Sequence, residues 1–432
     1  MNRLLLTLLC AFISSGLWAQ STLKEQMARD AESIESKIIS WRRDFHEHPE
    51  LGNEEIRTAG IIANHLQGLG LEVQTGVAKT GVVGILKGAL PGPVVALRAD
   101  MDALPVIERV DVPLKSTVKT IYHGQEAGVM HACGHDSHMA ILMATAEVLA
   151  KHKKELKGTV KFIFQPAEEG VFGEGIRFGA DLMVEEGVLK NPDVEAAFGL
   201  HINSQTPAGD IAYRPGPTMA GVDQFYITVK GKQVHGAYPW SGVDPVVTAS
   251  QIIMGLQTIV SRNVKLIDQP AVVSVGAIHG GNRHNIIPEE VKLIGTIRTL
   301  GVDQRALVHR RIKEIAEHIA ESAGAVAEVN IEDGYPVTVN DVALTKKMLP
   351  SLQEAAGTEH TYEKTVVMGA EDFSYFAREV PGLFFFLGGM NPHEDPNEAP
   401  AHHTPDFRLD ESGFVVGVKA FCNLVVDYAN LK

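Results

Sequence analysis

The segment VVALRAD, residues 94–100, is a short and almost continuous apolar run that ends on an acidic side chain. A run of this length and β-branched composition is typical of a strand buried in a parallel sheet. Comparable apolar runs recur along the chain at residues 159–164 (TVKFIF), 196–201 (AAFGLH) and 383–387 (LFFFL). Predicted helices alternate with these strands, at residues 23–45, 56–69 and 139–151. The alternation predicts an α/β domain with a mostly parallel sheet and helices on both faces.

Residues 219–339 follow a different order of elements. The hydrophobic pattern predicts four strands and two helices, with strands at residues 224–230, 272–278, 291–300 and 327–331 and helices at residues 244–260 and 303–322. Their order, βαββαβ, is the ferredoxin-like arrangement. We therefore predict a ferredoxin-like domain inserted into the larger α/β domain, whose first part is residues 20–218 and whose second part is residues 340–432.

Composition and charge limit the classes of protein and partner. The chain has 432 residues, of which 45% are hydrophobic and 21% are charged, as in a typical globular protein. This length exceeds one ordinary hydrophobic core, so two or three domains are expected. The formal net charge of −14 argues against nucleic acid or an anionic membrane as a partner.

The N-terminus has the pattern of an export signal. Asn2 and Arg3 give a short positive start, residues 4–13 are apolar, and cleavage is expected after Ala19. The apolar run is too short to span a bilayer comfortably. We therefore expect a signal peptide at residues 1–19 and an exported protein, periplasmic or secreted, without membrane association after its removal.

The segment MHACGHDSHM, residues 130–139, concentrates metal-binding side chains at a predicted loop-to-helix junction. Cys133 and His135 are one residue apart, so their side chains can converge on one point. Thiolate and imidazole are ligands of zinc-like ions. A Cys-x-His pair alone is weak evidence, because a loop cysteine beside solvated histidines has the same pattern. The other cysteine of the mature chain, Cys422, lies in an apolar run, so no disulfide is expected.

Three predicted strands end in acidic or imidazole side chains, at the edge where ligands bind in open α/β sheets. These side chains are Asp100 and Asp102 after the first strand, Glu168 and Glu169 after the second, and His201 on the third. A further pair, His402 and His403, lies near the C-terminus. Buried carboxylates and imidazoles without partners would be costly, and a pair of divalent ions would satisfy them.

The adjacent glutamates suggest a division of labour, with one carboxylate on metal and the other on water. A metal-bound water has a pKa of about 7, and a carboxylate within hydrogen-bond reach can take its proton. Two ions could share that water and polarise a carbonyl group. A metal-bound water, a carboxylate base and a polarised carbonyl are the groups that hydrolysis of an amide requires.

The motifs resemble those of the M20 metallopeptidase and amidohydrolase family, in its branch of aminoacylase, hippurate hydrolase and auxin-amino-acid hydrolase type. The matching segments occur in the expected order along nearly the whole mature chain: RADMDALP (residues 98–105), HACGHDSH (131–138), FQPAEEG (164–170), GLH (199–201) and HHTPDF (402–407). The resemblance implies a two-metal amidohydrolase that cleaves an N-acyl amino acid or a similar small conjugate by attack of a metal-bridging hydroxide. It also implies a homodimer formed through the inserted domain.

The same resemblance assigns the metal ligands and the general base. Cys133 would bridge the two ions, and the other ligands would be His135, Glu169, His201 and His403. Glu168 would be the general base and then the proton donor to the leaving amine. Zinc suits these ligands best, but manganese, cobalt and nickel remain open.

Four further residues receive roles around the metals. Asp100 would orient a metal ligand without binding metal itself. His235 would stabilise the tetrahedral oxyanion, and in this family it often comes from the partner subunit. Asn285 and Arg298 would grip the substrate carboxylate.

Three alternatives stay open on the sequence alone. The same machinery could act as a dipeptidase or carboxypeptidase, although no acidic residue is evident for binding a free α-amino group. The chain could be a metal-binding protein without catalysis, although that role has no need of Glu168. Cys133 could instead be a nucleophile, which predicts sensitivity to thiol reagents and none to chelators.

Overall fold

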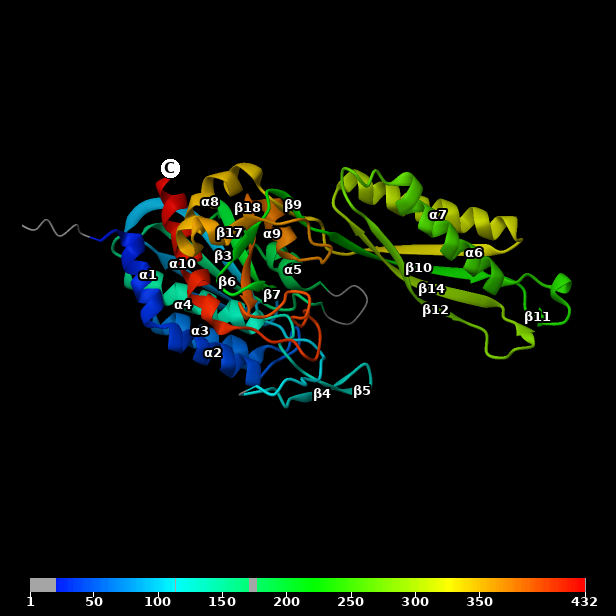
Figure 1. The fold of residues 1–432 in the computed structure, drawn as a ribbon, viewed down its shortest axis with the longest axis horizontal. Coiled ribbons are helices and arrows are strands. Elements are labelled where there is room, and N and C mark those ends of the chain that lie inside the picture. The colour runs from blue at the N-terminus through cyan, green and yellow to red at the C-terminus, as the bar shows by residue number, and fades with distance from the viewer. Residues whose placement is uncertain (1–20, 113, 171–176, 432) are drawn as a thin grey trace, which may run out of the picture.

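The computed structural model describes residues 21–112, 114–170 and 177–431. The expected signal peptide, residues 1–19, lies outside these described residues. Figure 1 shows two bodies side by side, a larger one on the left that contains both ends of the described chain and a smaller one on the right. The chain enters and leaves the smaller body through neighbouring segments, as expected for an insertion.

The larger body is built on an eight-stranded sheet. Its strands, in spatial order, are β1 (Glu72–Val77), β2 (Gly81–Lys87), β6 (Lys157–Gln165), β3 (Leu90–Asp100), β7 (Ala196–Pro207), β18 (Gly382–Met390), β8 (Ile211–Tyr213) and β17 (Thr361–Glu363). The four central strands β6, β3, β7 and β18 are parallel, and antiparallel pairs occur only toward the edges. The prediction of a mostly parallel sheet is confirmed.

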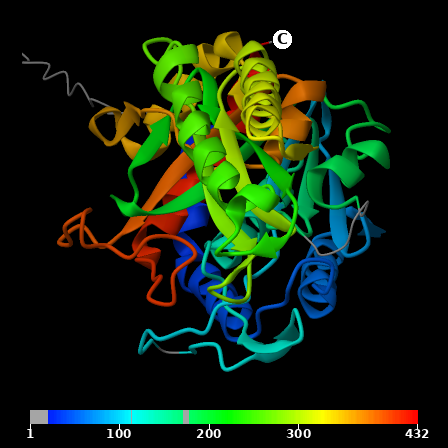
Figure 2. The same cartoon turned by 90° about the vertical axis from the view of Figure 1, so that its right-hand side faces the viewer.

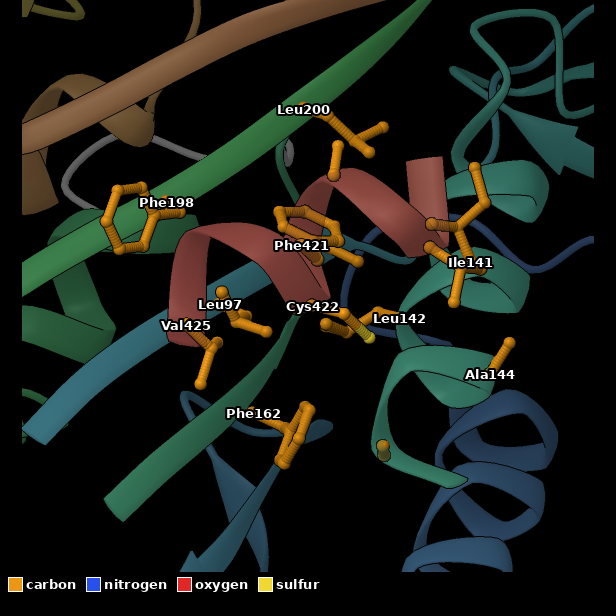
Figure 3. Packing of buried hydrophobic residues seen from close by; sticks show 14 of the residues in the cluster. Leu97, Ile141, Leu142, Ala144, Phe162, Phe198, Leu200, Phe421, Cys422 and Val425 are labelled. Atoms are coloured by element: carbon orange, nitrogen blue, oxygen red, sulfur yellow. The ribbon is translucent and has the colours of Figure 1, made fainter. Parts of the chain in front are cut away.

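Helices cover both faces of this sheet, as predicted. One face packs against α1 (Leu23–Ser33), α2 (Glu35–Glu47), α3 (Ile56–Gly68), α4 (His135–Lys151), α8 (Val342–Ala356) and α10 (Phe414–Asn430). The other face packs against α5 (Gly179–Glu185) and α9 (Phe373–Glu379). Figure 3 shows the first core, where Leu97 and Phe162 from neighbouring strands lie beneath Phe421 and Cys422 of α10. Their strand neighbours Ala96 and Ile163 face the opposite core, because successive side chains in a strand alternate.

Two predicted helix boundaries are wrong. The predicted helix at residues 23–45 is two helices, α1 and α2, which meet at Ile34 where the backbone leaves the helical conformation. The helix predicted at residue 139 begins at His135, directly after Gly134, whose φ of 90° ends the preceding loop. The second half of the metal-binding motif, from His135 to His138, therefore occupies the first turn of α4, which is buried although its residues are polar. Cys133 lies just before this helix.

Both cysteines in the described chain are buried and free, as expected. Cys422 lies on α10, within a stretch (Glu411–Asn430) that is long and apolar enough to cross a membrane. In this structure, however, 78% of the most apolar 18-residue window of this stretch is buried. The helix therefore lies at the centre of a protein core.

The smaller body, which we call the inserted domain, is a ferredoxin-like layer of two helices on one sheet. Its elements are β10 (Gly221–Lys230), α6 (Pro245–Thr258), β12 (Val272–Gly280), β14 (Glu290–Thr299), α7 (Val302–Ser322) and β15 (Val326–Asp333). The strand order β12-β14-β10-β15 is antiparallel throughout. The domain has its own hydrophobic core, to which Phe225, Ile252, Ile297 and Ile312 contribute. The predicted βαββαβ order is confirmed.

Two short strands join the bodies, and two others form the far tip. β9 (Gly216–Met219) pairs with β16 (Thr338–Asn340) where the chain passes between the bodies. The predicted domain boundaries at residues 219 and 339 fall on this pair and stay a prediction. β11 (Val234–His235) pairs with β13 (Ile286–Ile287) at the end of the inserted domain that lies farthest from the larger body (Figure 1). Figure 2 looks onto this end, with α6 and α7 in front of the larger body.

Leu97 is fully buried between β3 and the helices of the first core. Truncating a buried leucine removes its apolar contacts and leaves a cavity, at a cost of about 2–5 kcal/mol. We expect Leu97→Ala to lower Tm by about 2–6 °C in calorimetry, because the shift per kcal/mol is small for a chain of this length. Leu90→Ala on the same strand is the control, because Leu90 is 43% exposed and should change Tm little. Equal shifts for both variants would contradict the assignment of this core.

Candidate metal centre

The candidate site lies where the parallel strands of the large sheet end. β3 ends at Asp100, β6 ends at Gln165 just before the two glutamates, and His201 lies on β7. These ends open into a cavity of about 730 Å³ between the larger body and the inserted domain, which we call the large cavity. Its lining includes Cys133, Glu168, Glu169, His201, His403 and Arg298.

Cys133 is the centre of a tight group of potential ligands. Its Sγ lies 3.4 Å from Nε2 of His201 and 3.2 Å from Nε2 of His403. His403 Nε2 is also 3.1 Å from Oε1 of Glu169. Separations of this size are those between neighbouring ligands of one ion when each metal–ligand bond is about 2.0–2.3 Å long. The structure therefore gathers four of the five predicted ligands around Cys133.

The fifth predicted ligand, His135, lies on the other side of Glu169. Its Nδ1 is 3.2 Å from Oδ1 of Asp102, and its Nε2 is 4.0 Å from carboxylate oxygens of both Glu168 and Glu169. That Nε2 atom is buried and has no hydrogen-bond partner among the described residues. A buried imidazole nitrogen aimed at two carboxylates is costly unless a cation lies between them.

His403, and not His402, is available for metal. His402 accepts a hydrogen bond at Nε2 from the backbone N–H of Ser204, and its Nδ1 lies 3.2 Å from the carbonyl oxygen of Cys133. Both of its ring nitrogens are therefore used. His403 has a φ of 63°, a left-handed conformation that is strained for a side-chain-bearing residue, and this conformation accompanies the approach of its ring to Cys133.

His138 and Asp100 form a supporting pair beneath the ligands. His138 Nδ1 lies 2.5 Å from Oδ1 of Asp100, and its Nε2 accepts the backbone N–H of Ile202. This bond ties the first turn of α4 to β7, directly beside His201. Asp100 therefore orients His138, which is not one of the predicted ligands. The predicted ligand His135 is held by Asp102 instead.

Asp102 was named from the sequence as a strand-end carboxylate, but it was given no role. It accepts the backbone N–H of Glu169 at 2.9 Å with one oxygen and contacts His135 with the other. The carboxylate thus fixes the ring of His135 and the backbone of Glu169. Residues that hydrogen-bond to metal ligands commonly orient them in this way. The Asp-x-Asp spacing signalled this role, but it did not tell which aspartate faces which imidazole.

A buried arginine connects two of the motifs, residues 98–105 and 164–170, with the segment before α9. Arg98 is 1% exposed and donates to Gln165, Asp100 and Asp372, with Glu371 at 2.9 Å. These partners come from strands β3 and β6 and from the segment before α9, so one guanidinium ties three parts of the chain together. Arg suits this position because its five donors are fixed in a plane and remain charged when buried.

The loop that carries the glutamates is held in an unusual conformation. Ala167 has a φ of 52°, and its backbone N–H donates to the buried carboxylate of Glu55. The hydroxyl of Tyr335 donates to the carbonyl oxygen of Glu168 at 2.5 Å. The burial of Glu55 and the neighbouring charge of Asp102 raise the pKa of Glu55 to about 7. These contacts direct Glu168 and Glu169 into one cavity from adjacent positions.

The electrostatics of the site favour bound positive charge. Burial, together with the carboxylates of Glu371 and Glu169, raises the pKa of Glu168 well above its usual range. Burial opposes a charge on His135, yet Asp100 and Asp102 raise the pKa of its imidazole to about 10. Burial and the nearby carboxylates also raise the pKa of the Cys133 thiol. The clustered thiol, imidazole and carboxylate donors fit divalent cations.

The structure does not bring every predicted site residue together. Arg298 lines the large cavity with Glu168 and Cys133. His235 lies instead on the exposed tip strand β11, and Asn285 is beside it, accepting the backbone N–H of Gly236. Within one chain, His235 and Asn285 are remote from the metal ligands because β11 and β13 form the far end of the inserted domain (Figure 1).

Comparison with known proteins shows the family of the chain. The model of Peptidase family M20/M25/M40 matches residues 96–427. The chain is 41% identical over 410 residues to thermostable carboxypeptidase 2 of Saccharolobus solfataricus, covering 94% of this chain and 99% of that one. It is 39% identical over 401 residues to N-acetylcysteine deacetylase of Bacillus subtilis, covering 91% and 97%.

A solved structure shows the same fold. The Bacillus subtilis YXEP protein, described as a dinuclear metal binding peptidase from the M20 family, superimposes with a TM-score of 0.75 at 36% identity. The match covers 92% of this chain and 99% of that one. On the family match, the relatives and the fold together, the chain belongs to Peptidase family M20/M25/M40.

Proposed function

We propose that the protein is a two-metal hydrolase that cleaves the amide bond of N-acyl amino acids or similar small conjugates. The observation that carries this proposal is the position of Glu168, a carboxylate that shares one cavity with the ligand cluster and with Arg298. The names of two relatives, a deacetylase of an N-acetylated amino acid and a dinuclear peptidase, support the reaction class.

The ligand cluster is the proposed place of the two ions. Cys133, Glu169, His201 and His403 would hold them together with His135, and zinc suits this donor set best, with manganese, cobalt and nickel as alternatives. When bound, such ions polarise a carbonyl group and lower the pKa of water. The carboxylate of Asp100 fixes the imidazole of His138, and the carboxylate of Asp102 fixes that of the proposed ligand His135.

Glu168 would move the proton in this reaction. Its Oε2 lies on the cavity wall 4.0 Å from Nε2 of His135, and no backbone or side-chain donor in the described residues occupies its carboxylate. A carboxylate with a raised pKa is a better base, so it can accept a proton from water and return it to the leaving amine. The same position is unnecessary in a metal-binding protein without catalysis.

Arg298 would hold the amino-acid half of the substrate. It lies near the end of β14, opposite Val222 of β10, where the inserted domain faces the large cavity. Burial lowers the pKa of Arg298, but guanidinium remains charged in proteins and can bind a carboxylate with two hydrogen bonds. This placement orients the scissile amide toward Glu168.

A second candidate function is carboxypeptidase activity with the same machinery, because a relative at 41% identity carries that name. Both reactions release an amino acid with a free carboxylate, so Arg298 serves either. A panel of acetyl- and benzoyl-amino acids beside plain dipeptides distinguishes the two activities. Cleavage of a plain dipeptide needs a partner for the free α-amino group, whereas cleavage of an N-acyl amino acid does not.

We further propose an exported homodimer. The N-terminal pattern of Asn2, Arg3 and the apolar residues 4–13 supports export to the periplasm or the medium. The exposed tip of the inserted domain supports the dimer, because it carries His235 and Asn285 far from the metal ligands of its own chain. A partner's tip could supply both groups to this cavity.

Glu168→Gln should reduce kcat by at least about 100-fold, since the amide cannot accept the proton. Metal content, measured by plasma mass spectrometry, should stay near that of the wild type because Glu168 is not one of the proposed ligands. Glu379→Gln is the matched control, as Glu379 is exposed and does not line the large cavity. Retained turnover in the Glu168 variant would remove the proposed mechanism.

Asp102→Asn should weaken metal binding about 10- to 100-fold, because the amide holds the ring of His135 less firmly and no longer offsets its charge. The measurement is a competition titration with a chelating dye at fixed pH. Asp406→Asn serves as the control, because Asp406 is half exposed and, among the described residues, pairs only with Arg109. An unchanged affinity in the Asp102 variant would show that its contact with His135 has no bearing on metal.

Mixed dimers test the proposed sharing of His235. Glu168→Gln and His235→Ala should each be nearly inactive alone, for different reasons. After unfolding and refolding as an equal mixture, about a quarter of wild-type activity should return, because half of the dimers are mixed and one of their two sites is intact. If no activity returns although mixed dimers form, His235 does not act across the interface.

A further inference from the structure

The inserted domain is joined to the larger body by two crossing segments, residues 218–222 and 334–338, which we call the junction (Figure 1). The backbone N–H of Val222 donates to the carbonyl oxygen of Tyr335 at 3.0 Å. The two crossing segments are therefore bonded to each other, and Tyr335 takes part in that bond.

The junction also rests on a wall of the large cavity. The backbone N–H of Ala220 donates to the carbonyl oxygen of Val367 at 2.9 Å, and the hydroxyl of Thr338 donates to that of Glu371 at 2.9 Å. Val367 and Glu371 both line the large cavity. The place where the chain passes between the bodies is therefore part of the candidate site.

Tyr335 is fixed to the inserted domain through its neighbour Gly334. The backbone N–H of Gly334 donates at 3.1 Å to the carboxylate of Asp223, which is buried. The same carboxylate accepts from Arg305 and pairs with His309, both of which lie on α7. A movement of α7 relative to the larger body would therefore carry the backbone at Tyr335 with it.

The side chain of Tyr335 reaches the loop of the two glutamates. Its hydroxyl donates to the carbonyl oxygen of Glu168 at 2.5 Å. Its ring makes edge-to-face contacts with Phe178 and Tyr375, with centroids 6.3 and 6.2 Å away. These contacts hold the ring, so the position of the hydroxyl follows the backbone of Tyr335.

The direction of the Glu168 side chain depends on its backbone. No hydrogen bond to its carboxylate occurs within the described part of the chain. The backbone N–H groups of its two neighbours donate to Glu55 and Asp102, which belong to the larger body. The bond from Tyr335 to the carbonyl oxygen of Glu168 is the one of these three contacts that comes from the junction.

We propose that Tyr335 is a positioning residue that couples the placement of the inserted domain to the direction of Glu168. The inference rests on the proposed function, because it takes Glu168 as the general base and Arg298 as the group that holds the substrate. Arg298 lies on the inserted domain, so the body that would hold the substrate also fixes the backbone of the base through Tyr335. The coupling matters because a displacement of about 1 Å at a reacting group can cost about 100-fold in rate.

Tyr335→Phe tests the positioning role, because it removes the hydroxyl and keeps the ring. With an N-acetyl amino acid as substrate, kcat should fall about tenfold and KM should change less than about twofold. Metal content and Tm should change little, since one net hydrogen bond is small in a chain of this length. Tyr375→Phe is the matched control: its ring lies against Tyr335, but its hydroxyl donates no hydrogen bond within the described residues, so kcat should be unchanged.

Gly221→Ala tests the coupling from the other crossing segment without removing the hydroxyl. An added Cβ would lie 3.1 Å from the carbonyl oxygen of Tyr335 and 3.2 Å from the backbone nitrogen of Val337, so the segment at Tyr335 must shift by a few tenths of an ångström. We expect kcat to fall about threefold, and the double variant with Tyr335→Phe to lose no more than Tyr335→Phe alone. The control is Gly276→Ala on β12 of the same domain, where the nearest atom to an added Cβ is 3.9 Å away.

Each result decides one part of the inference. An unchanged kcat in Tyr335→Phe, or a raised KM with kcat retained, would overturn the positioning role. An unchanged kcat in Gly221→Ala, or losses that multiply in the double variant, would overturn the coupling to the inserted domain. All of these outcomes leave the proposed function standing as long as Glu168→Gln is inactive, whereas turnover in Glu168→Gln removes the proposed function and the role of Tyr335 with it.

Discussion

The site depends on an accumulation of buried negative charge at the ends of the parallel strands. Arg98 meets Asp100, Glu371 and Asp372 in the interior, and one guanidinium cannot balance three carboxylates. Buried charge is tolerated only when it is paired, because removal from water costs several kcal/mol per ion. Glu168 and Glu169 add to the excess, and divalent cations beside Cys133 would restore the balance. The stability of the fold and the proposed chemistry therefore both require positive charge at this end of the sheet.

The two-body architecture separates the tasks of this chemistry. The larger body fixes the ligands with strand ends, the first turn of α4 and a strained loop, all of which rest on a packed core. The inserted domain contributes Arg298 from one end and carries His235 at the other. A rigid centre and an attached domain that faces substrate are suited to binding small conjugates that differ in their acyl and amino-acid halves. The specificity would then come from cavity walls rather than from the ligands.

Hydrophobic pattern predicted the four central strands of the large sheet and the βαββαβ insertion, because each buried strand leaves a compact apolar run in the sequence. The short strands at the edges and at the tip left no such run. The pattern also failed where polar residues are buried. The first turn of α4 reads as a loop because His135 and His138 are polar, although Gly134 begins the helix before them. Pattern also could not tell that Asp102 faces His135 while Asp100 faces His138, since both pairings satisfy the spacing. The position of His235 depends on a tertiary arrangement that no local motif records.

The proposed centre would hold two cations on Cys133, Glu169, His201, His403 and His135. Crystals of the protein prepared with zinc or manganese, measured on both sides of the metal absorption edge, test it directly. The account predicts two anomalous peaks per chain, each within about 2.5 Å of Cys133 Sγ, with Glu169, His201, His403 and His135 as the surrounding ligands. Anomalous density that is absent from this cluster, or that lies elsewhere while Cys133 remains unliganded, would contradict it.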